Sequence, residues 1–298
     1  MSVDLTALSQ SIASIVERVA PSIVRVEARR RHGATGFVWS TEGHILTSHH
    51  AIEREGSITV GLADGRTAPA ELVGRDPSTD LALLKAELPG LVPLAPVPLE
   101  GLQVGHLVLA IGRPGRTARA TLGIVSALGE GWRTYAGGRI DRYLETDADL
   151  PPGFSGGALV DTQGRCLGLL TAALSRNAAV AVPGETLTRV AQSLRQPGGI
   201  RRGYLGVGAH PVRLPQNLWA RAGSEGGLIF LTIEPDGPAD RAGLMMGDVL
   251  VSLGGQPLHS IEELMGYLSD EKVGTQVQAR VLRAGDVREV PITLGKRS

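Results

Sequence analysis

The stretch Pro152-Gly153-Phe154-Ser155-Gly156-Gly157 decides between two folds that can hold a reactive serine. A Gly-x-Ser-x-Gly sequence occurs at the nucleophile of α/β-hydrolases, where the serine lies between a strand and a helix. Here the residues that follow are Ala158-Leu159-Val160, a polar turn over 161–164 and the apolar run 166–170, which together predict a β-hairpin. The hydrolase order also needs a downstream histidine, and both histidines after Ser155 lie beyond a predicted linker. The sequence therefore favours antiparallel β structure around Ser155; the alternative is a plain glycine-rich loop.

The rest of the chain also predicts a mainly β protein. It has 298 residues, 40 glycines and 18 prolines without a fixed period, which excludes collagen and long regular helices. Many short apolar runs are bounded by turn residues and few helices separate them, so we expect antiparallel sheets closed into barrels. In the first two thirds of the chain, strands are expected at 24–28, 37–39, 45–47, 58–62, 81–85, 107–111 and 122–127.

The chain is long enough for two domains. Residues 1–20 are predicted to form an amphipathic helix, and a domain over 21–196 ends with a second helix around 187–194. The Pro- and Gly-rich residues 197–202 are the predicted linker. A second domain over 203–298 follows, with strands at 204–209, 228–233, 249–253, 277–282 and 289–293 and short helices at 238–242 and 261–268.

Composition excludes several classes of function. Thirty basic and thirty acidic residues cancel, and aromatic residues make up only 3%, so a nucleic-acid partner is not expected. Cys166 is the only cysteine, so it can form no internal disulfide, and its apolar surroundings predict a buried residue. No metal or cofactor is implied, because no His-Glu-x-x-His sequence occurs and His49-His50 cannot easily direct both rings at one metal. No apolar stretch approaches the length of a membrane span.

Two stretches before Ser155 carry residues that can activate a serine. His50 lies in Thr47-Ser48-His49-His50-Ala51 at the end of a predicted strand, and Asp80 immediately precedes the apolar run 81–84. Each alone reads equally as a core histidine or a turn aspartate. Their order along a barrel-forming chain, histidine, aspartate, serine, is one in which a catalytic triad is found.

With these residues in place, the chain resembles the HtrA (Deg) family of trypsin-like serine proteases with a C-terminal PDZ domain. Three strings carry the likeness: Thr47-Ser48-His49-His50-Ala51, the run from Thr79 to Lys85, and the run from Thr146 to Leu159. Further segments agree at 104–105, 110–114 and 123–126, and the likeness extends from about residue 19 to residue 295. The resemblance implies a fold of two six-stranded antiparallel β-barrels followed by a PDZ domain.

The resemblance also implies a role for each site residue. His50 would be the general base, Asp80 would orient it, and Ser155 would be the nucleophile. The backbone N–H groups of Gly153 and Ser155 would form the oxyanion hole. A specificity pocket for small or medium aliphatic side chains would be lined by Leu170, Thr171, Ala172 and Ala173.

The second domain carries its own binding motif. The stretch Gly203-Tyr204-Leu205-Gly206-Val207 resembles the carboxylate-binding loop of HtrA-type PDZ domains, which implies that Tyr204, Leu205, Gly206 and Val207 bind peptides. A C-terminal peptide would add a strand beside Val207, and Pro211 predicts that this strand is short. The alternative is a PDZ fold that only packs against the protease.

Departures from the family pattern affect the loop before the nucleophile. Phe154 and Pro151 each replace an asparagine, and the loop 174–182 is short. We interpret these changes as altered specificity or regulation.

The sequence thus predicts an ATP-independent serine endopeptidase that cleaves unfolded or misfolded proteins. The rival hypothesis is a protease-silent PDZ adaptor or holdase. Homotrimers through the N-terminal helix are expected from the family, although that helix could instead cover its own barrel. The first residues do not resemble an export signal, so we expect a cytoplasmic location, with a periplasmic one as the alternative if the chain starts after processing.

Overall fold

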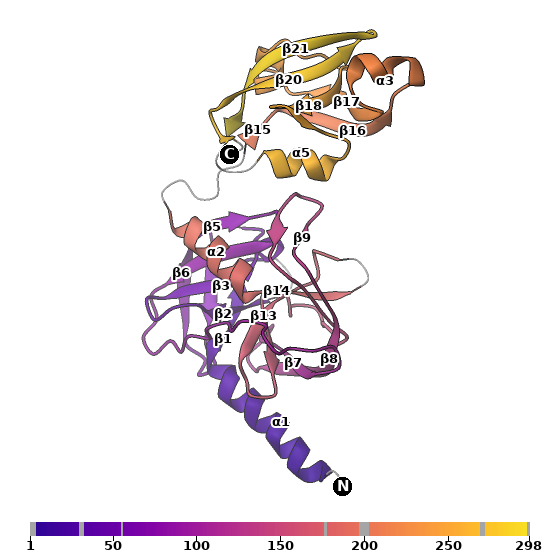
Figure 1. The fold of residues 1–298 in the computed structure, drawn as a ribbon. Coiled ribbons are helices and arrows are strands. Elements are labelled where there is room, and N and C mark those ends of the chain that lie inside the picture. Colours follow the sequence, from indigo (N-terminus) through magenta and orange to yellow (C-terminus); the bar gives the residue numbers. More distant parts are fainter. Residues whose placement is uncertain are drawn as a thin grey trace. The chain divides into compact units, whose positions relative to one another are not determined.

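A computed structural model of the chain describes residues 4–29, 33–54, 56–175, 178–196, 203–268 and 272–296. They form two compact units, divided between Gln196 and Gly203 (Figure 1). The predicted linker 197–202 lies outside the described residues. None of the helices that the structure describes is both long and apolar enough to cross a membrane.

The first barrel closes with the strand order β1-β2-β3-β6-β5-β4, in which every neighbouring pair is antiparallel. One strand, β5, was not expected from the sequence. Its burial alternates with period two, but its less exposed positions are Ala68, Ala70, Leu72, Gly74 and Asp76, of which only Leu72 is a large apolar residue, so the sequence lacks the pattern that marks the other strands. The strands are β1 (Ile23–Glu27), β2 (Ala34–Val38), β3 (His44–Ser48), β4 (Ile58–Gly61), β5 (Thr67–Asp76) and β6 (Leu81–Ala86).

The second barrel closes with the order β11-β14-β13-β12-β7-β8, again antiparallel throughout. The hairpin predicted after Ser155 is confirmed, since β12 pairs with β13 and Gly164 in their turn has φ of +74°. Cys166 is buried as expected, and burial raises the pKa of its thiol to about 12. The strands are β7 (Leu107–Gly112), β8 (Arg119–Gly129), β11 (Tyr143–Thr146), β12 (Ala158–Asp161), β13 (Cys166–Thr171) and β14 (Ala179–Pro183); a small separate sheet holds β9 (Trp132–Arg133) and β10 (Arg139–Ile140). The expected double-barrel fold is confirmed.

Strands from both barrels share one apolar core. It contains Phe37, Leu46 and Leu83 of the first barrel and Ile111 and Leu169 of the second. Because residues on both faces of β2, β3 and β6 are covered, nearly every side chain of these strands is buried. This shared core brings the ends of β3, β6 and β12 together, where the candidate site lies.

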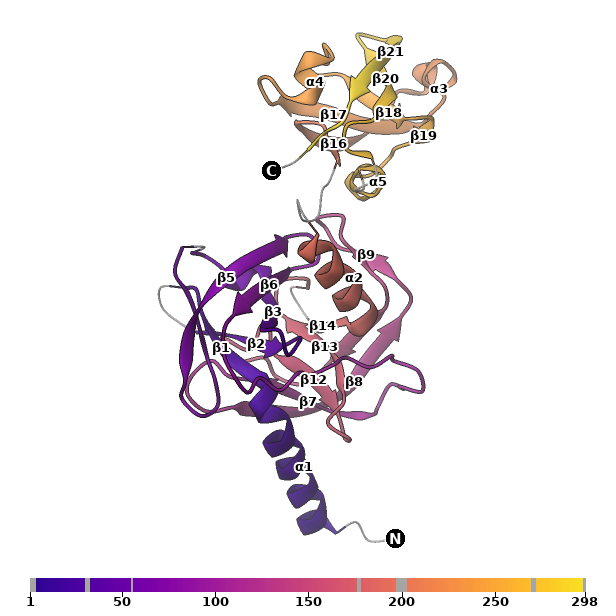
Figure 2. The same cartoon turned by 90° about the vertical axis from the view of Figure 1, so that its left-hand side faces the viewer.

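Helix α1 (Leu5–Val19) begins at Asp4, whose carboxylate accepts hydrogen bonds from the N–H groups of Thr6 and Ala7. Its last turns pack on the barrels through Ile15 and Val19, whereas Leu5 at its start is 74% exposed. In both views the helix extends away from the barrels (Figures 1 and 2). The C-terminal half of α1 therefore covers its own domain, Leu8 and Ile12 line a cavity with residues of β7 and β8, and Leu5 at the start of the helix stays exposed.

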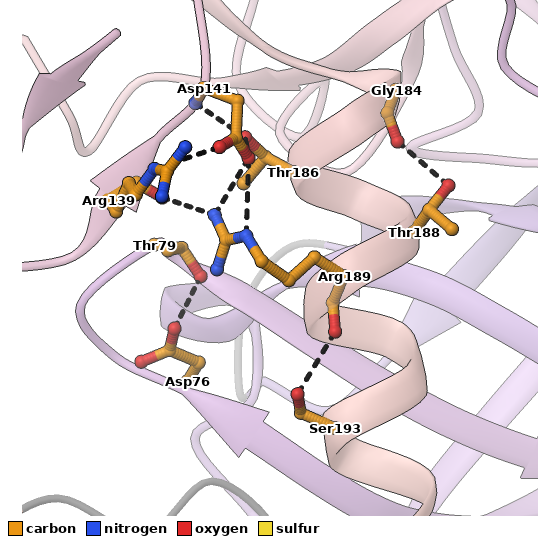
Figure 3. Close-up of polar contacts among 9 residues, drawn as sticks. All are labelled: Asp76, Thr79, Arg139, Asp141, Gly184, Thr186, Thr188, Arg189 and Ser193. Carbon is orange, nitrogen blue, oxygen red and sulfur yellow. Dashed lines mark hydrogen bonds and ion pairs between the residues drawn. The ribbon is translucent and has the colours of Figure 1, made fainter. Parts of the chain in front are cut away.

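Helix α2 (Gly184–Arg195) is held at its N-terminal end by Asp141, the residue after β10 (Figure 3). The Asp141 carboxylate accepts hydrogen bonds from Thr186 Oγ1 at 2.9 Å and from Arg189, and Arg139 lies 3.0 Å away. Burial disfavours its charge, but the hydrogen bonds from Arg189 and Thr186 outweigh burial and hold the pKa of Asp141 below its ordinary value.

This cluster gives a pH-dependent contribution to stability. We expect Asp141→Asn to lower the free energy of unfolding at pH 7 by about 1 kcal/mol. A carboxyl group with a lowered pKa in the folded state stabilises that state above its unfolded pKa and loses the effect as pH falls through the folded value. The difference between wild type and variant should therefore shrink below about pH 4. Urea unfolding at several pH values measures it; a difference that is constant with pH would contradict the assignment. The exposed Glu71→Gln is the control.

The second unit contains a six-stranded sheet with the order β16-β17-β18-β20-β21, in which β19 pairs with β18, and a two-stranded sheet of β15 and β22. The expectation of a short strand after the carboxylate loop was wrong: β16 spans seven residues and includes Pro211. Because β16 is the outermost strand, an interior proline costs it no hydrogen bond to a further strand. The strands are β15 (Gly203–Tyr204), β16 (Val207–Arg213), β17 (Gly226–Ile233), β18 (Val249–Leu253), β19 (Gln256–Pro257), β20 (Gln276–Arg283), β21 (Asp286–Thr293) and β22 (Gly295–Lys296).

Three helices complete this unit: α3 (Gln216–Ala222), α4 (Pro238–Arg241) and α5 (Ile261–Tyr267). Helix α5 starts at Ser260 with a capping box that includes Glu263. The sequence did not reveal α3, because its first residue is preceded by Pro215 without a side-chain cap and only Ala222 is fully buried.

Candidate active site

His50 and Asp80 become neighbours through strand pairing. His50 lies in a 3₁₀ turn (His49–Ala51) that directly follows β3, and Asp80 directly precedes β6. In the antiparallel register Ser48 is opposite Leu81, and the N–H of His49 donates to the Asp80 carbonyl at 3.0 Å. The chain thus places the two side chains at the same end of the first barrel.

The Asp80 carboxylate holds the His50 ring in one orientation. Asp80 Oδ2 lies 2.7 Å from His50 Nδ1, and Asp80 Oδ1 accepts the His50 N–H at 2.9 Å. Because an ionised carboxylate only accepts, Nδ1 must carry the proton, which leaves Nε2 of the neutral ring as an acceptor. The Asp80 side chain is 3% exposed and that of His50 is 32% exposed. The carboxylate is therefore buried, whereas the imidazole is accessible to solvent.

Several donors keep Asp80 charged although it is buried. Burial disfavours the carboxylate charge, but the hydrogen bonds and charge of His50 and the hydroxyl of Thr171 outweigh this effect and lower the pKa of Asp80. The backbone of Asp80 has φ of +56°, a left-handed conformation that is uncommon outside glycine. The ring of neighbouring His49 takes no part in this pair: burial lowers the pKa of the ring, and its Nδ1 has no hydrogen-bond partner among the described residues.

Ser155 lies in a loop that is fixed to strands on both sides. Its carbonyl accepts the N–H of Thr35 on β2, and the next residue, Gly156, donates to the carbonyl of Leu170 on β13 at 2.8 Å. Gly156 has φ of +90°, and a Cβ there would lie 1.9 Å from the Thr35 carbonyl oxygen, so this position requires glycine. Among the described residues, the hydrogen bond to Ser155 Oγ comes from the N–H of Ala172, at 3.4 Å.

The N–H groups predicted to form the oxyanion hole are not bonded to other described residues. The N–H groups of Gly153 and Ser155 donate no hydrogen bond to any residue that the structure describes. Gly153 has φ of +89°, and a Cβ there would lie 2.6 Å from the Gly33 carbonyl oxygen. Two unpaired N–H groups beside a serine can stabilise negative charge on a bound carbonyl oxygen.

Thr35 is a site residue that sequence reasoning missed. It is fully buried, its N–H donates to the Ser155 carbonyl at 3.3 Å, and its Oγ1 donates to the Gly153 carbonyl at 2.7 Å. The same Oγ1 accepts the N–H of Arg113 at 2.8 Å. Thr35 therefore links β2 and β7 to the loop that carries the nucleophile. Its flanking glycines, Gly33 and Gly36, were the signal in the sequence that this segment approaches another part of the backbone.

Phe154 points away from the site. It is 1% exposed and packs in the core of the second barrel with Leu170 and Ala148. Its ring also covers Gly112, where a Cβ would lie 3.0 Å from the ring atoms. The aromatic side chain thus anchors the loop to the core of the second barrel. The Pro151 carbonyl accepts the Phe154 N–H at 3.0 Å and closes the turn.

An open cavity of about 480 Å³ is lined in part by Ala172, whose N–H lies 3.4 Å from Ser155 Oγ. Of the four residues expected to line a specificity pocket, Ala172 lines this cavity; Leu170 and Thr171 are fully buried, and Ala173 is exposed, with its N–H bonded to Thr171 Oγ1. The cavity lining comprises Ser126, Glu145, Thr146, Asp147, Ala148, Asp149, Leu150, Ala172, Ser175, Ala178 and Ala179. The acidic members of this lining were not foreseen, because they come from β11 and the segment after it rather than from the residues following β13.

In the second unit, the predicted carboxylate loop joins β15 to β16. Gly206 has φ of +75°, Leu205 is 3% exposed, and their carbonyls accept the N–H groups of Glu234 and Ala239. The N–H groups of Leu205 and Gly206 donate to no described residue. Tyr204 pairs with Gly295, and Val207 begins the edge strand β16, against which α5 packs (Figure 1).

The described residues contain no group of three or more His, Cys, Asp or Glu side chains arranged to hold a metal ion.

Comparison with known families matches both units. Residues 34–169 match a trypsin-like peptidase domain, and residues 203–294 match a PDZ domain. The first match includes His50, Asp80 and Ser155.

Curated relatives cover most of this chain. A probable periplasmic serine endoprotease, DegP-like, from Halomonas elongata is 37% identical over 273 residues, 89% of this chain and 57% of that protein. The periplasmic pH-dependent serine endoprotease DegQ of Escherichia coli K12 is 33% identical over 88% of this chain and 59% of its own length. The chain thus spans less than two thirds of these relatives. Both are named as periplasmic, so our cytoplasmic expectation was wrong; the first residues of the chain do not decide its compartment.

Solved structures match over nearly the whole chain. The HtrA-type protease AlgW with a decapeptide has a TM-score of 0.73 and 30% identity, and the match covers 96% of this chain and 98% of that one. The serine endoprotease from Yersinia pestis matches with the same TM-score and coverage at 32% identity. By fold, sequence and domain order, the chain belongs to the HtrA family of trypsin-like serine proteases with a PDZ domain.

Proposed function

We propose that this protein is a serine endopeptidase that cleaves unfolded or misfolded proteins without ATP. The observation that supports this most is the His50–Asp80 pair at 2.7 Å, whose carboxylate also accepts from Thr171, next to Ala172, whose N–H donates to Ser155 Oγ. The N–H groups of Gly153 and Ser155, which donate to no described residue, add to it. Relatives named as serine endoproteases support the same reaction class.

The geometry suggests a role for each group. Ser155 Oγ attacks the scissile carbonyl carbon as Nε2 of His50 takes its proton, and Asp80 stabilises the resulting imidazolium. The oxyanion accepts the N–H groups of Gly153 and Ser155. Collapse of this intermediate expels the amine, to which His50 returns the proton, and water then hydrolyses the acyl-enzyme. Ser155 Oγ must turn from the Ala172 N–H to His50 for this step, and catalytic hydrogen bonds commonly tighten on substrate binding.

The remaining assignments rest on the second unit and on relatives. The N–H groups of Leu205 and Gly206 suit a terminal carboxylate, with the peptide strand added to the open edge of β16. A peptide complex of a related protease supports peptide binding by this chain. We assign the protein to the periplasm because its relatives are named as periplasmic. We also propose that it forms a homotrimer through the exposed start of α1.

The proposal is tested with a fluorophosphonate probe, whose phosphorus is attacked by an activated serine hydroxyl with loss of fluoride. We expect mass spectrometry to locate the label on Ser155 of the wild type. Casein cleavage should be lost in proportion to the fraction of Ser155 that is labelled. Ser155→Ala should take no label, and Ser193→Ala, in helix α2 and outside the cavity lining, is the matched control. Equal casein cleavage by wild type and Ser155→Ala would refute the proposal, and no cleavage by either, with no label, would favour the adaptor or holdase.

Thr35 should act as a positioning residue. Thr35→Val keeps the shape but removes the donor to the Gly153 carbonyl and the acceptor for Arg113. We expect kcat to fall about 10²-fold with little change in KM, since a small displacement of catalytic groups has this effect. Thr35→Ser retains the hydroxyl and should restore most of kcat. If valine and serine lower kcat equally, the hydroxyl does not position the loop.

Peptide binding by the second unit should depend on a free carboxylate. In full-length Ser155→Ala protein, which avoids cleavage, a labelled peptide with a free C-terminus should bind at least about tenfold more tightly than its C-terminal amide, because charge-assisted hydrogen bonds are lost. Fluorescence anisotropy measures both. Equal affinities would mean that the Leu205–Gly206 loop does not bind a carboxylate.

A further inference from the structure

The cavity beside Ser155 is placed to receive the substrate side chain next to the scissile bond. Ala172 forms part of its wall, and the N–H of the same residue lies 3.4 Å from Ser155 Oγ. A residue whose carbonyl carbon is attacked by Ser155 therefore has this cavity within reach of its side chain. The position of the cavity relative to the nucleophile identifies it as a specificity pocket; the chemistry of its walls decides what it accepts.

One wall of the cavity is made of small side chains. Ala172 follows β13, Ala178 precedes β14, and Ala179 is its first residue. These residues leave room for a long side chain. Leu150 adds an apolar surface on which a methylene stem can pack.

The same cavity is lined by carboxylates that make no ion pair with any Lys or Arg that the structure describes. Glu145 accepts only from neutral hydroxyls, those of Ser126 and Tyr143, and the second bond contributes most to raising the pKa of Tyr143 to about 12. Asp147 accepts the N–H of Ile124 at 2.6 Å. The lining includes no Lys or Arg among the described residues.

Asp149 is the carboxylate best able to bind a ligand. Its side chain is exposed, and it has no hydrogen bond or ion pair with any described residue. Its carbonyl accepts Thr121 Oγ1 at 2.7 Å, which fixes the backbone while the carboxylate stays free.

We propose that this cavity is a primary specificity pocket for a basic side chain, with Asp149 as the residue that determines the preference. An aliphatic side chain would bury carboxylates without compensating charge, which is costly. Arginine or lysine places its stem along Leu150 and its cation at the carboxylates, and the planar guanidinium can bind one carboxylate with two hydrogen bonds. An acidic side chain is repelled. The proposal deepens the proposed protease function and depends on it, and it replaces the aliphatic preference that the family resemblance implied.

The test compares peptides that differ only at the residue before the scissile bond: arginine, lysine, valine or glutamate. We expect kcat/KM for arginine to exceed that for valine at least about tenfold, with glutamate poorest. Asp149→Asn should lower kcat/KM for the arginine peptide about 10- to 100-fold, the range of a lost charge-assisted contact, and leave the valine peptide within about twofold. Glu100→Gln removes an exposed carboxylate elsewhere in the same unit and controls for net charge.

A second readout does not require peptide cleavage. Benzamidine, an aromatic amidinium, should slow labelling of Ser155 by the fluorophosphonate in the wild type and in Glu100→Gln, and much less in Asp149→Asn. If Ser155 is labelled but valine is preferred to arginine and benzamidine gives no protection, the pocket proposal is wrong while the protease function stands. If Ser155 takes no label and no peptide is cleaved, both fail.

Discussion

Replacing Asp80 by asparagine is expected to lower kcat for cleavage of an unfolded protein about 10⁴-fold. In the wild type, the ionised carboxylate accepts the Nδ1 proton of His50 at 2.7 Å and leaves Nε2 free to take the serine proton. In the wild type, Thr171 Oγ1 donates to the same Oδ2 that contacts His50. An asparagine NH₂ group in the place of Oδ2 would therefore point at both the Thr171 hydroxyl and the imidazole. An NH₂ donor at Nδ1 moves the ring proton to Nε2, and the histidine can then no longer act as the base.

The measurement is single-turnover cleavage of casein, with circular dichroism and thermal unfolding to show that the variant is folded. Asp64→Asn is the control: Asp64 bonds Arg66 in a surface turn between β4 and β5 and should keep wild-type kcat. A loss of less than about tenfold in Asp80→Asn would mean that Asp80 does not set the tautomer of His50.

Truncating Phe154 is expected to give the largest loss of stability. Phe154→Ala removes a fully buried aromatic ring from the core of the second barrel, and such changes cost about 3–5 kcal/mol. Phe154→Asn should be at least as destabilising, because its amide would be buried among apolar side chains. The ring also supports Gly153 and Ser155 on either side, so kcat should fall together with stability. Phe154→Leu fills more of the cavity and should recover part of both.

Urea unfolding monitored by circular dichroism gives the change in stability. Tyr135→Ala, which truncates a 93% exposed ring, should lie within about 0.5 kcal/mol of wild type. If Phe154→Ala also unfolds within about 1 kcal/mol of wild type, the ring does not anchor the loop. In that case Phe154 would be a loop residue at which substitution has little effect on stability.

Much of the fold could be predicted from local patterns. The hairpin after Ser155, the turn residues and helix α2 each depend on residues close together in the sequence, and each was recognised. Two of the missed elements bury few side chains: β5 buries two of ten residues and α3 only Ala222. Strands β11 and β14 were missed too, and β14 lies partly in the segment 174–182 that was expected to be a loop, although four of its five residues are buried. The length of β16 was underestimated because an edge position, which permits Pro211, is a property of the whole sheet.

By itself, the sequence determined the strand-rich fold, the order of the two domains and the family, because turn residues, apolar alternation and the strings around His50, Asp80 and Ser155 are local. Only the tertiary structure decided what surrounds Ser155. Thr35 reaches the nucleophile loop from β2, Phe154 turns into the core, and carboxylates of β11 and of the segment after it line one cavity with small residues beside β13 and β14. The physical reason is that barrel closure, through a shared apolar core, brings distant segments to one end of the sheets, and no pattern along the chain records which of them meet.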